Sequence, residues 1–456
     1  FKKLGSKLRK KAVFCCILAV VMIMVTMAAY GIYKLSVRKN YILYMSYNDK
    51  IFNAASIDSS YVCDESDAVF AADRKTFYIA RWPEFIDKSR LTESFVSQNG
   101  KYFAATVYDS DAKIYTLYAW SEDGSFEISS GRNSKNVKTV TNEGVIIFSE
   151  TEVVNLEGNM GDSALFVCTA VLDKSKEKGS QLYGVTDKIE GRLKSAYVYS
   201  GSDLIVYSNM DNKLFTYNYD KKDRKPIASV DSFYSMSAET PYLYEAQTSD
   251  EIFFAEADSL IYSAGGVYYF YDLEDDKNVV IGKVNGTNIS FIYEKKNNCM
   301  YIISSGQVEY GVIEEGALKQ RRNIDELGNL ENTVYIDSKG QLIFINSSNQ
   351  LTAVHKGITR ILKEQVADGS LNRVGNTNEG ITYISEKTQY YKPDLSAAET
   401  AVCSEPDLTG TADTYLYKNR LYYYNAAGEL YSVKKNGEDR TIIGNVDRLW
   451  LGTQLK

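Results

Sequence analysis

Residues 420–443, RLYYYNAAGELYSVKKNGEDRTII, decide the fold. They contain an aromatic run, a polar turn, a second run in which apolar and polar residues alternate, a charged turn and a third apolar run. Tyrosine, valine and isoleucine are enriched in β-strands, whereas glycine, asparagine and aspartate are typical of turns. The stretch therefore predicts three consecutive strands joined by short turns.

The same pattern recurs along the chain. Residues 203–230, DLIVYSNMDNKLFTYNYDKKDRKPIASV, and 333–362, TVYIDSKGQLIFINSSNQLTAVHKGITRIL, have the same order of runs and turns. Comparable first strands begin near Leu204, Ile252, Met300, Leu342, Ile381 and Leu421, at steps of 39 to 48 residues. Less regular candidates occur earlier, at Leu43, Tyr102, Val145 and Leu165.

A period of this length with about four strands per repeat predicts an all-β fold, a β-propeller. Stacking such sheets around an axis buries each sheet against its neighbours. The 37 tyrosines suit this packing, because the ring packs between sheets while the hydroxyl reaches a turn or water. Residues 40–456 would form seven or eight blades, and we prefer eight, with residues 40–55 supplying a strand to the short last repeat. A β-sandwich array or a β-helix is the alternative.

The first 39 residues differ from the rest. Residues 1–11, FKKLGSKLRKK, carry six positive charges, residues 12–33 carry none, and residues 34–39 form a short linker. Twenty-two residues at about 1.5 Å each span roughly 33 Å as a helix, enough for a bilayer core of about 30 Å. We therefore expect a single transmembrane helix over 12–33. A buried core helix and a cleaved signal peptide are the competing interpretations.

The flanking charges predict the orientation of this helix. Six basic residues precede it and three follow it, so the positive-inside rule places the N-terminus in the cytoplasm and residues 40–456 outside the cell membrane. Residues 1–39 hold nine of the 52 basic residues and none of the 59 acidic ones, which leaves residues 40–456 with an excess of 16 acids. Such an acidic domain is a poor ligand for nucleic acid, whose phosphates need a basic surface.

The texture of residues 420–443, repeated at 203–230, resembles a Tyr-rich β-propeller domain of unknown function found in membrane-anchored proteins of Gram-positive bacteria. Residues 98–128, QNGKYFAATVYDSDAKIYTLYAWSEDGSFEI, also resemble one repeat of the TolB-like and dipeptidyl-peptidase-type propellers. The resemblance implies a propeller behind a single membrane span. It brings no catalytic motif with it.

Motifs for common enzyme chemistry are absent. The sequence lacks the phosphate-binding loop, the dinucleotide fingerprint and the G-x-S-x-G elbow of hydrolases. His355 is the only histidine, so multi-histidine metal sites are excluded. We interpret His355 as a packed or turn residue rather than a catalyst. Gly161-Asp162-Ser163 is only superficially similar to a serine-protease nucleophile, because no matching histidine context exists.

Three acidic stretches are interpreted as turns. Ser121–Phe126, SEDGSF, is close to the Asp-box of sialidase-type propellers but has the Asp-Gly pair of a tight hairpin. Residues 109–111 and 274–276 are acidic clusters without the downstream glutamate of a calcium loop. We therefore expect solvated turns at all three.

The cysteines predict neither a metal site nor a disulfide framework. Cys15 and Cys16 lie in the apolar span, and Cys63, Cys168, Cys299 and Cys403 are more than 100 residues apart. No C-x-x-C pair occurs, and Cys168 and Cys299 lie in apolar strands, where a thiol packs as a small hydrophobic group.

The sequence therefore favours a membrane-anchored extracytoplasmic propeller that binds or scaffolds a surface protein, a peptide or a cell-wall polymer without catalysis. Besides the lipid bilayer around residues 12–33, the expected partner lies on a propeller face. No catalytic, metal or cofactor-binding residue is assigned, and the binding residues stay open. The alternatives are a glycan-active enzyme that works with carboxylates and the sensory ectodomain of a signalling protein whose cytoplasmic part lies upstream.

Overall fold

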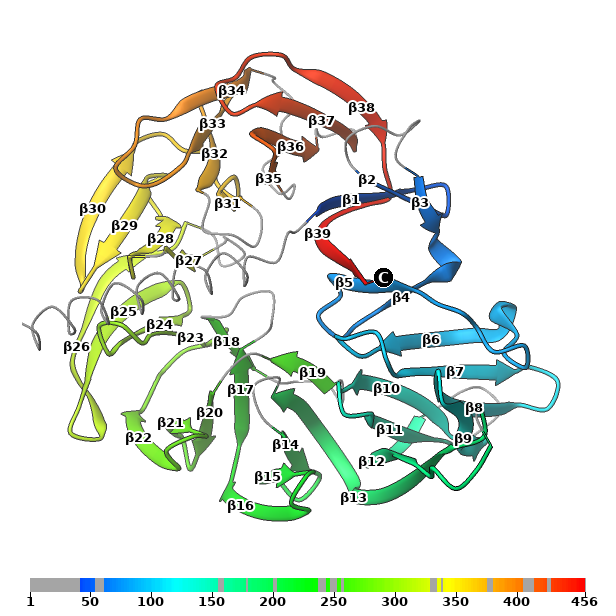
Figure 1. Cartoon of the computed structure of the whole chain (residues 1–456). Coiled ribbons are helices and arrows are strands. Elements are labelled where there is room, and N and C mark those ends of the chain that lie inside the picture. The colour runs from blue at the N-terminus through cyan, green and yellow to red at the C-terminus, as the bar shows by residue number, and fades with distance from the viewer. Residues whose placement is uncertain are drawn as a thin grey trace, which may run out of the picture. The chain divides into compact units, whose positions relative to one another are not determined.

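Strands form nearly all of the regular structure in the computed structural model (Figure 1). It describes residues 42–53, 61–154, 160–177, 179–199, 203–236, 243–246, 252–255, 258–328, 334–337, 339–374, 380–404, 414–424 and 428–455. Leu43–Lys456 form one unit and Phe1–Ile42 another. Within the described ranges no helix is long and apolar enough to cross a membrane. The predicted segments 1–11, 12–33 and 34–39 lie outside those ranges.

Four sheets have the four antiparallel strands in chain order that a propeller blade requires. The first contains β6 (Leu91–Val96), β7 (Phe103–Asp109), β8 (Ile114–Ser121) and β9 (Gly124–Gly131). The second contains β27 (Tyr335–Ile336), β28 (Leu342–Ile345), β29 (Leu351–His355) and β30 (Ile358–Lys363). The third contains β31 (Asn372–Arg373), β32 (Ile381–Ser385), β33 (Thr388–Lys392) and β34 (Thr400–Ser404). The fourth contains β35 (Tyr415–Tyr417), β36 (Arg420–Tyr424), β37 (Glu429–Lys434) and β38 (Thr441–Asn445).

A larger sheet joins two such units through one long strand. Its path is β10 (Ser134–Val140), β11 (Val145–Val153), β12 (Met160–Leu172), β13 (Leu182–Tyr199), β14 (Leu204–Asn209), β15 (Lys213–Asn218) and β16 (Asp223–Ser229). The first part of β13 pairs with β12, and its last residues pair with β14. The strand β19 (Ile252–Ala255) pairs with the end of β13 in parallel.

Two further units are linked to each other. The first contains β17 (Ser232–Met236), β20 (Ser259–Ala264), β21 (Val267–Asp272) and β22 (Lys277–Gly282). The second contains β23 (Ser290–Glu294), β24 (Cys299–Ser304), β25 (Gln307–Glu314) and β26 (Ala317–Glu326). The strand β18 (Leu243–Ala246) pairs with both β17 and β23, and Val280 of β22 pairs with Ala317 of β26.

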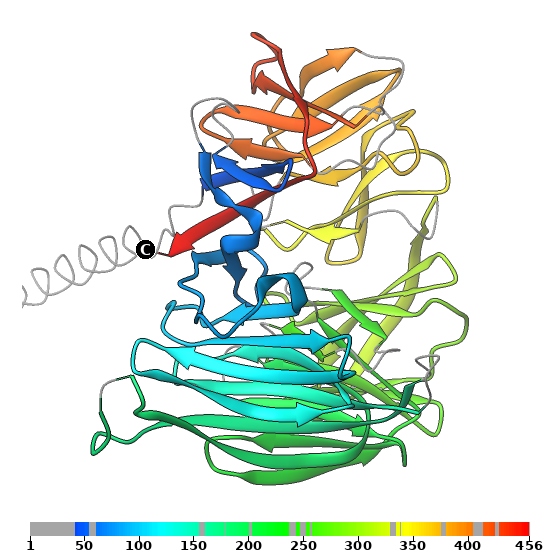
Figure 2. The ribbon, with the colours of Figure 1, turned by 90° about the vertical axis from the view of Figure 1, so that its right-hand side faces the viewer.

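The first and last strands of the described chain meet in one sheet. Its order is β3 (Tyr61–Asp64), β2 (Lys50–Asn53), β1 (Ile42–Tyr47), β39 (Arg448–Leu455), β5 (Thr76–Ile79) and β4 (Ala68–Phe70). The short 3-10 helices η1 (Glu65–Asp67) and η2 (Lys88–Arg90) follow β3 and precede β6. The amide of Asp447 donates to the carbonyl of Ser46 over 2.8 Å. Figure 2 shows β39 beside the N-terminal strands, so this pairing closes the ring.

The closure was expected, but its arrangement differs from the expectation. The last repeat is complete, because β35–β38 already form a four-stranded sheet. A single C-terminal strand, β39, instead joins the three N-terminal strands β1–β3. The first and last parts of the chain therefore depend on each other for a paired sheet, which removes two exposed edges.

Buried side chains fill the spaces between consecutive sheets, which is the packing of a propeller. Tyr197, Val206 and Leu214 of one unit, for example, pack against Phe233 and Leu260 of the next. Similar clusters lie between the other neighbouring units around the ring in Figure 1. The all-β propeller fold that the repeats predict is therefore confirmed.

The tyrosines behave as expected in part. The Tyr262 ring is buried between sheets and its hydroxyl donates to Asn278 over 3.0 Å. The hydroxyl of Tyr383 likewise donates to Glu399. Tyr207 is different, because its hydroxyl is buried without a hydrogen-bond partner. Ring packing, rather than hydrogen bonding, is therefore what these residues share.

Most of the predicted repeat starts fall on the second strand of a unit. Leu204, Met300, Leu342, Ile381 and Leu421 lie in β14, β24, β28, β32 and β36, and Leu43, Val145 and the residue after Tyr102 lie in β1, β11 and β7.

Two of the predicted starts are wrong. Ile252 begins β19, which lies beside β13, and the second strand of that unit is β20. The strands β18 and β19 are inserted before β20, and their apolar residues have the composition of a blade strand. Leu165 lies in the third strand of its unit, β12.

The predicted number of blades is not confirmed. Grouped by their pairings, the described strands make nine four-stranded units when β13 is counted in both units that it joins. The shared strand and the extra strands β4, β5, β18 and β19 are the reason why counting residues per repeat does not settle the number of blades.

A partly buried carboxylate links two neighbouring units. The amide of Val137 in β10 donates to the carboxylate of Glu93 in β6. Burial raises the pKa of Glu93 to about 7. In the unfolded chain a glutamate has a pKa of about 4.3, so between these values the folded protein binds more protons than the unfolded chain. The free energy of unfolding therefore falls as the pH rises from about 4 to about 7.

Replacing this residue, Glu93→Gln, is expected to remove that pH dependence, because the amide oxygen still accepts from Val137 but does not ionise. At pH 8 the variant should gain up to about 3 kcal/mol in free energy of unfolding, and at pH 4 it should match the wild type. Urea unfolding at both pH values measures this, with the exposed Glu122→Gln as control. An equal effect of Glu93→Gln at the two pH values would contradict the assignment.

Candidate functional site

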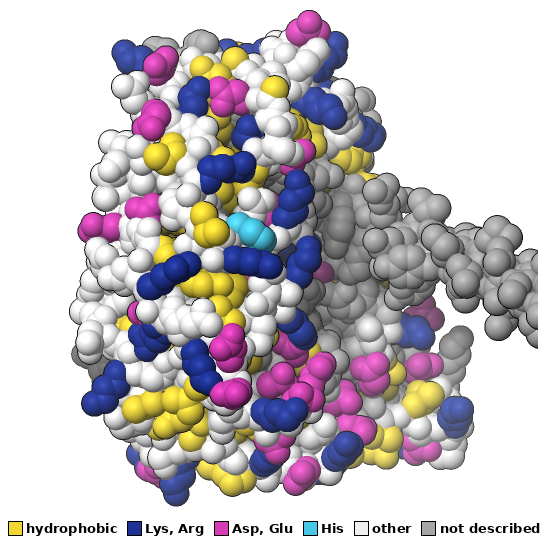
Figure 3. Space-filling model, turned by 90° about the vertical axis from the view of Figure 1, so that its left-hand side faces the viewer, with side chains coloured by type: hydrophobic (Ala, Val, Ile, Leu, Met, Phe, Trp, Pro, Cys, Tyr) yellow, Lys and Arg dark blue, Asp and Glu magenta, His cyan; other side chains and the backbone are white. Residues whose placement is uncertain are grey.

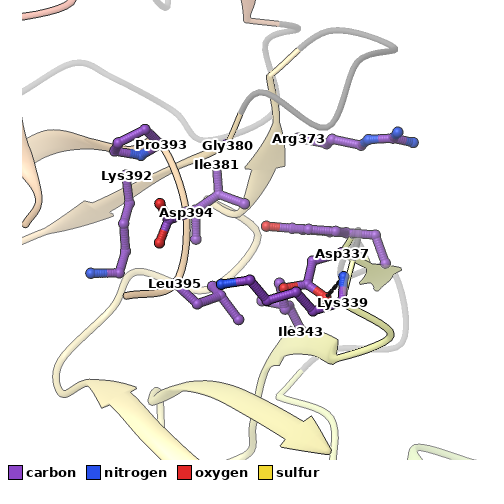
Figure 4. A pocket seen from close by; sticks show the side chains of 11 residues that line it. Asp337, Lys339, Ile343, Arg373, Gly380, Ile381, Lys392, Pro393, Asp394 and Leu395 are labelled. Atoms are coloured by element: carbon purple, nitrogen blue, oxygen red, sulfur yellow. Dashed lines mark hydrogen bonds between the residues drawn. The ribbon is translucent and has the colours of Figure 1, made fainter. Parts of the chain in front are cut away.

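A pocket lies between the sheet β27–β30 and the sheet β31–β34 (Figure 4). Its volume is about 420 Å³, part of which is open to solvent. Residues from three connections and from five strands form it. They are Tyr335, Asp337, Lys339, Ile343, Arg373, Gly380, Ile381, Lys392, Pro393, Asp394 and Leu395.

The floor of the pocket is apolar. Tyr335, Ile343, Ile381 and Leu395 belong to the hydrophobic core between the two sheets, and each is buried. Tyr335 and Ile343 face one another on paired strands, since β27 and β28 align these two residues. The pocket is thus the place where the core between two sheets opens to the surface.

One wall is the turn between β27 and β28. The carboxylate of Asp337 accepts hydrogen bonds from the amides of Lys339 (2.9 Å) and Gln341 (2.8 Å), and from the Gln341 side chain (3.0 Å). Aspartate commonly caps turns in this way. The carboxylate therefore holds the turn in shape and places the exposed Lys339 at the margin of the pocket.

The opposite wall is the connection between β33 and β34. The carboxylate of Asp394 accepts from the amides of Ser396 (2.7 Å) and Ala397 (2.9 Å), and from the Ser396 hydroxyl. These hydrogen bonds, helped by the charge of Lys339, hold the pKa of Asp394 below its usual value. Asp394 therefore stays ionised at neutral pH.

Gly380, which directly precedes β32, lets the backbone there approach the connection between β33 and β34 closely. Its φ is +115°, in the region that side chains rarely adopt. A Cβ atom there would lie 2.4 Å from the carbonyl oxygen of Lys392 and 2.8 Å from the Cα atom of Pro393. Because both contacts are with backbone, any larger residue would displace the connection that carries Asp394.

Three cationic side chains surround the floor. Lys339 comes from the β27–β28 turn, Arg373 from the end of β31 and Lys392 from the end of β33. Figure 4 shows Lys392 and Arg373 extending toward opposite ends of the pocket. The Lys392 ammonium group donates to the carbonyl of Ala397. Against these three cations stand the two carboxylates of Asp337 and Asp394, so the charged side chains of the lining have a net charge of +1.

The histidine that the sequence analysis singled out lies away from this pocket. His355 ends β29 at the turn to β30, and its side chain is exposed. Figure 3 shows it on the surface among lysine and arginine side chains. Asp162 and Ser163 lie in another sheet, where Asp162 faces Arg192 at 3.5 Å and the buried Ser163 hydroxyl lies 2.8 Å from that of Thr151. The structure therefore does not bring these three residues into one site.

The acidic stretches predicted as turns are turns. Ser121 and Gly124 pair across a hairpin whose two loop residues are Glu122 and Asp123, so the predicted hairpin turn is present. The carboxylate of Asp109 accepts from the amides of Asp111 and Ala112, both over 2.9 Å, and pairs with Arg90. These interactions lower the pKa of Asp109, and the hydrogen bond from the Ala112 amide contributes most.

The acidic stretch 274–276 joins β21 to β22. Asp275 pairs with Lys277 at 2.8 Å, and Asp276 pairs with Lys225 and accepts from the Tyr271 hydroxyl. Across the described part of the chain, no group of three or more histidine, cysteine or acidic residues could hold a metal ion.

The four cysteines beyond the apolar span are buried free thiols. Burial raises the pKa of Cys63 to about 11 and that of Cys299 to about 12. Cys168 and Cys299 each belong to a core between sheets, which is the role that their apolar context predicts. Protonated and buried, these thiols are poor nucleophiles.

Sequence reasoning did not find the pocket. The sequence contains local turn signals on both sides of the pocket, which are Asp337 with Gly340 and the run Lys392-Pro393-Asp394. Nothing local indicates that these two turns face each other, because their adjacency follows from the order of sheets around the ring.

No protein-family model and no curated protein matches the chain. Among solved structures, BamB from Moraxella catarrhalis is 11% identical, with 64% of this chain and 84% of that chain covered and a TM-score of 0.33. The β-propeller domain of Myceliophteria thermophila Cps50 (Swd1) is 12% identical, with 57% and 86% covered and a TM-score of 0.32. A eukaryotic initiation factor is 9% identical, with 91% and 99% covered and a TM-score of 0.48. Because these sequence identities and TM-scores are low, the assignment of the fold is based on the strand pairings of this chain.

Proposed function

We propose that the chain is a membrane-anchored extracytoplasmic β-propeller that binds a surface protein, a peptide or a cell-wall polymer and does not catalyse a reaction. The observation that carries this proposal is the pocket between β27–β30 and β31–β34. It combines an apolar floor with cationic side chains at its margin, and its walls are turns held by the sheets. Concave apolar sites with a few placed polar groups are the usual form of a binding site.

The anchoring part of the proposal is supported by the sequence. Residues 12–33 are uncharged, and six basic residues precede them against three that follow closely. The resemblance of 420–443 to Tyr-rich propeller domains of membrane-anchored proteins agrees with this topology. Protease added to intact cells should therefore digest epitopes beyond residue 40, and their full protection would contradict the proposed orientation.

The pocket also contains two carboxylates, which is the observation that favours the alternative of a glycan-active enzyme. Such an enzyme needs a carboxylic acid with a raised pKa to protonate the leaving group. The pKa of Asp394 is lowered instead, chiefly by the Ser396 hydroxyl and amide. Asp337 is engaged by three hydrogen bonds within its own turn. Both carboxylates support the walls, so binding is the function that this geometry favours.

Capture by the full chain tests the proposal. Immobilised in detergent, the wild-type protein should retain a component of a cell-surface extract, and Lys339→Glu should reduce the retained amount at least tenfold. Lys174→Glu, which reverses another exposed lysine in the β12–β13 connection, should leave capture unchanged. Equal capture by all three proteins, or turnover of glycans that Asp337→Asn abolishes, would overturn the proposal.

A further inference from the structure

We propose that the free edge of β30 (Ile358–Lys363) binds an extended acidic segment of a partner protein, which adds a strand to the sheet β27–β30. This edge shares no residue with the pocket, so the inference goes beyond the proposed function and stands without it. It identifies a second interaction surface and the chemistry of the partner that fits it.

The edge of β30 offers backbone groups to a further strand. Among the described strands only β29 pairs with it, and Figure 1 shows β30 at the outside of the ring. Lys356 and Gly357 join the two strands with φ values of +49° and +72°, which is a two-residue hairpin turn whose flanking pair is hydrogen-bonded. Because such pairs alternate with non-hydrogen-bonded ones, Thr359 and Ile361 direct their amides and carbonyls to the free edge.

Two exposed isoleucines give this edge an apolar surface. Ile358 is 71% exposed and Ile361 is 48% exposed. Among the large hydrophobic residues that the structure describes, Ile358 has the largest exposed fraction. Figure 3 shows hydrophobic side chains between the lysine and arginine side chains around His355. A strand added along β30 would cover part of this surface, and the removal of apolar area from water favours the pairing.

The end of β30 nearest to the turn is basic. Residues 355–363, HKGITRILK, contain three lysine or arginine residues and no acid. Lys363, at the far end of the strand, pairs with Glu399 over 2.6 Å. Lys356 and Arg360 form no ion pair with any residue that the structure describes. The positive charge that is left without a carboxylate therefore lies near the turn.

Neighbouring residues add to this charge. Arg322 of β26 donates to the carbonyl of Gly357 over 3.3 Å, which places a third cation beside the turn. Glu364, the first acid after β30, follows the opposite end of the strand. In the outer strands β16 and β22, by contrast, Arg224 and Lys277 each pair with a carboxylate. The cations near the turn of β30 are therefore available to a partner.

These features fit an acidic polypeptide better than other ligands. The edge offers both donors and acceptors, which a polypeptide strand matches, whereas a polyphosphate chain only accepts hydrogen bonds. A second copy of β30 would bring its own cations against these, and like charges opposite each other destabilise a sheet. Residues 40–456 carry an excess of 16 acids, so an acidic strand is attracted to this edge and not to the surface at large.

The two faces of β30 predict the pattern of the partner strand. Successive side chains point to opposite faces, so Arg360 lies on one face and Thr359 and Ile361 lie on the other. A partner in which acidic and apolar residues alternate would place its acids beside Arg360 and its apolar side chains beside Ile361.

Fluorescence anisotropy with the full chain in detergent tests the inference. The probe is a fluorescein-labelled heptapeptide with glutamate at the odd positions and valine at the even positions. The full chain should bind it. Proline in place of the central valine should weaken binding at least tenfold, because proline keeps all four charges but has no amide to pair with the edge. The matching peptide with lysines in place of the glutamates should also bind at least tenfold more weakly.

Two substitutions in β30 test the site from the side of the protein. Arg360→Glu should weaken binding of the glutamate peptide at least tenfold and should strengthen binding of the lysine peptide. Thr359→Pro removes an amide that faces away from β29, so it should abolish binding while the fold remains, as Pro226 in the outer strand β16 indicates. Circular dichroism checks the fold, and the exposed Lys174→Glu should bind like the wild type.

The remaining outcomes decide against the inference. Equal binding of the valine and proline peptides would show attraction between charges without strand pairing. Displacement of the peptide by a lower concentration of inorganic polyphosphate would assign the edge to a polyanion. Self-association of the chain that Thr359→Pro abolishes would place a second copy there instead. Should Thr359→Pro unfold the protein, peptide binding that Arg360→Glu leaves unchanged would still overturn the inference.

Discussion

Replacing Trp450 by alanine is expected to lower the free energy of unfolding by about 3–5 kcal/mol, one of the largest effects of any single substitution in this protein. Trp450 lies in β39 and is 5% exposed. Its ring stacks on Tyr44 of β1, with centroids 5.7 Å apart, and contacts Phe70 of β4 at 5.8 Å. It therefore packs against the strands on both sides of the closure.

The expected loss extends to the whole propeller, because these contacts hold the first and last strands together. The guanidinium of Arg448 lies 4.9 Å from the Trp450 ring and donates to the carbonyl of Arg74 over 3.0 Å, so the substitution also removes a cation–π contact. Urea unfolding followed by far-ultraviolet circular dichroism should show one transition at a lower midpoint. Trp450→Phe should recover most of the loss.

An exposed aromatic residue gives the matched control. Phe85 is 53% exposed, and Phe85→Ala should cost less than about 1 kcal/mol. If Trp450→Ala were no more destabilising than Phe85→Ala, the packing at the closure would not support the ring. A variant that unfolds in two transitions, with only the β39 sheet lost first, would also contradict the account.

The second large effect is expected at Lys135. Lys135 is only 2% exposed. Its ammonium group donates to the carbonyl of Asn133 over 3.2 Å and lies 3.6 Å from the Glu150 carboxylate. Burial lowers the pKa of Lys135, although the charge of Glu150 opposes the shift. Lys135→Ala leaves this carboxylate without its cation and opens a cavity. The expected loss is about 3–5 kcal/mol in free energy of unfolding.

A double-mutant cycle separates the charge from the packing. Lys135→Met keeps most of the volume but still leaves the Glu150 carboxylate without its cation, whereas Lys135→Met with Glu150→Gln removes both charges. The double variant should be more stable than Lys135→Met, because a buried pair replaced on both sides costs little. Purely additive effects would show that the two residues do not interact.

Local structure could be predicted well from the sequence. The three strands read from residues 420–443 are β36, β37 and β38, because alternation and turn residues act over a few positions. The Asp-Gly hairpin at Ser121–Gly124 was predictable for the same reason. A period near 40 residues then followed from the recurrence of this unit, and with it the propeller.

Pairing between distant strands could not be predicted in the same way. The 18-residue strand β13 belongs to two units. The strand β19 has the composition of a blade strand but pairs in parallel with the end of β13. Composition reports that a segment is a strand, but not which edge it joins, because edges are chosen by packing far along the chain. The number of blades depended on those choices.

The pocket was unpredictable for a related reason. Its walls are the turns near Asp337 and Asp394, which are far apart in the sequence. The two turns come together only because their sheets stack on each other. Gly380 is an ordinary loop glycine in the sequence, and its importance becomes visible only beside the backbone of Pro393. The membrane helix over 12–33 lies outside the described residues and stays a prediction.

Photo-crosslinking at position 339 tests the binding function most directly. A photoreactive amino acid is introduced at position 339 or at position 174 of the full chain, and intact cells are irradiated. Position 339 should give one discrete adduct with a surface protein or peptide, and position 174 should give none. The same adducts at both positions, or an adduct at 174 alone, would contradict a binding site between β27–β30 and β31–β34.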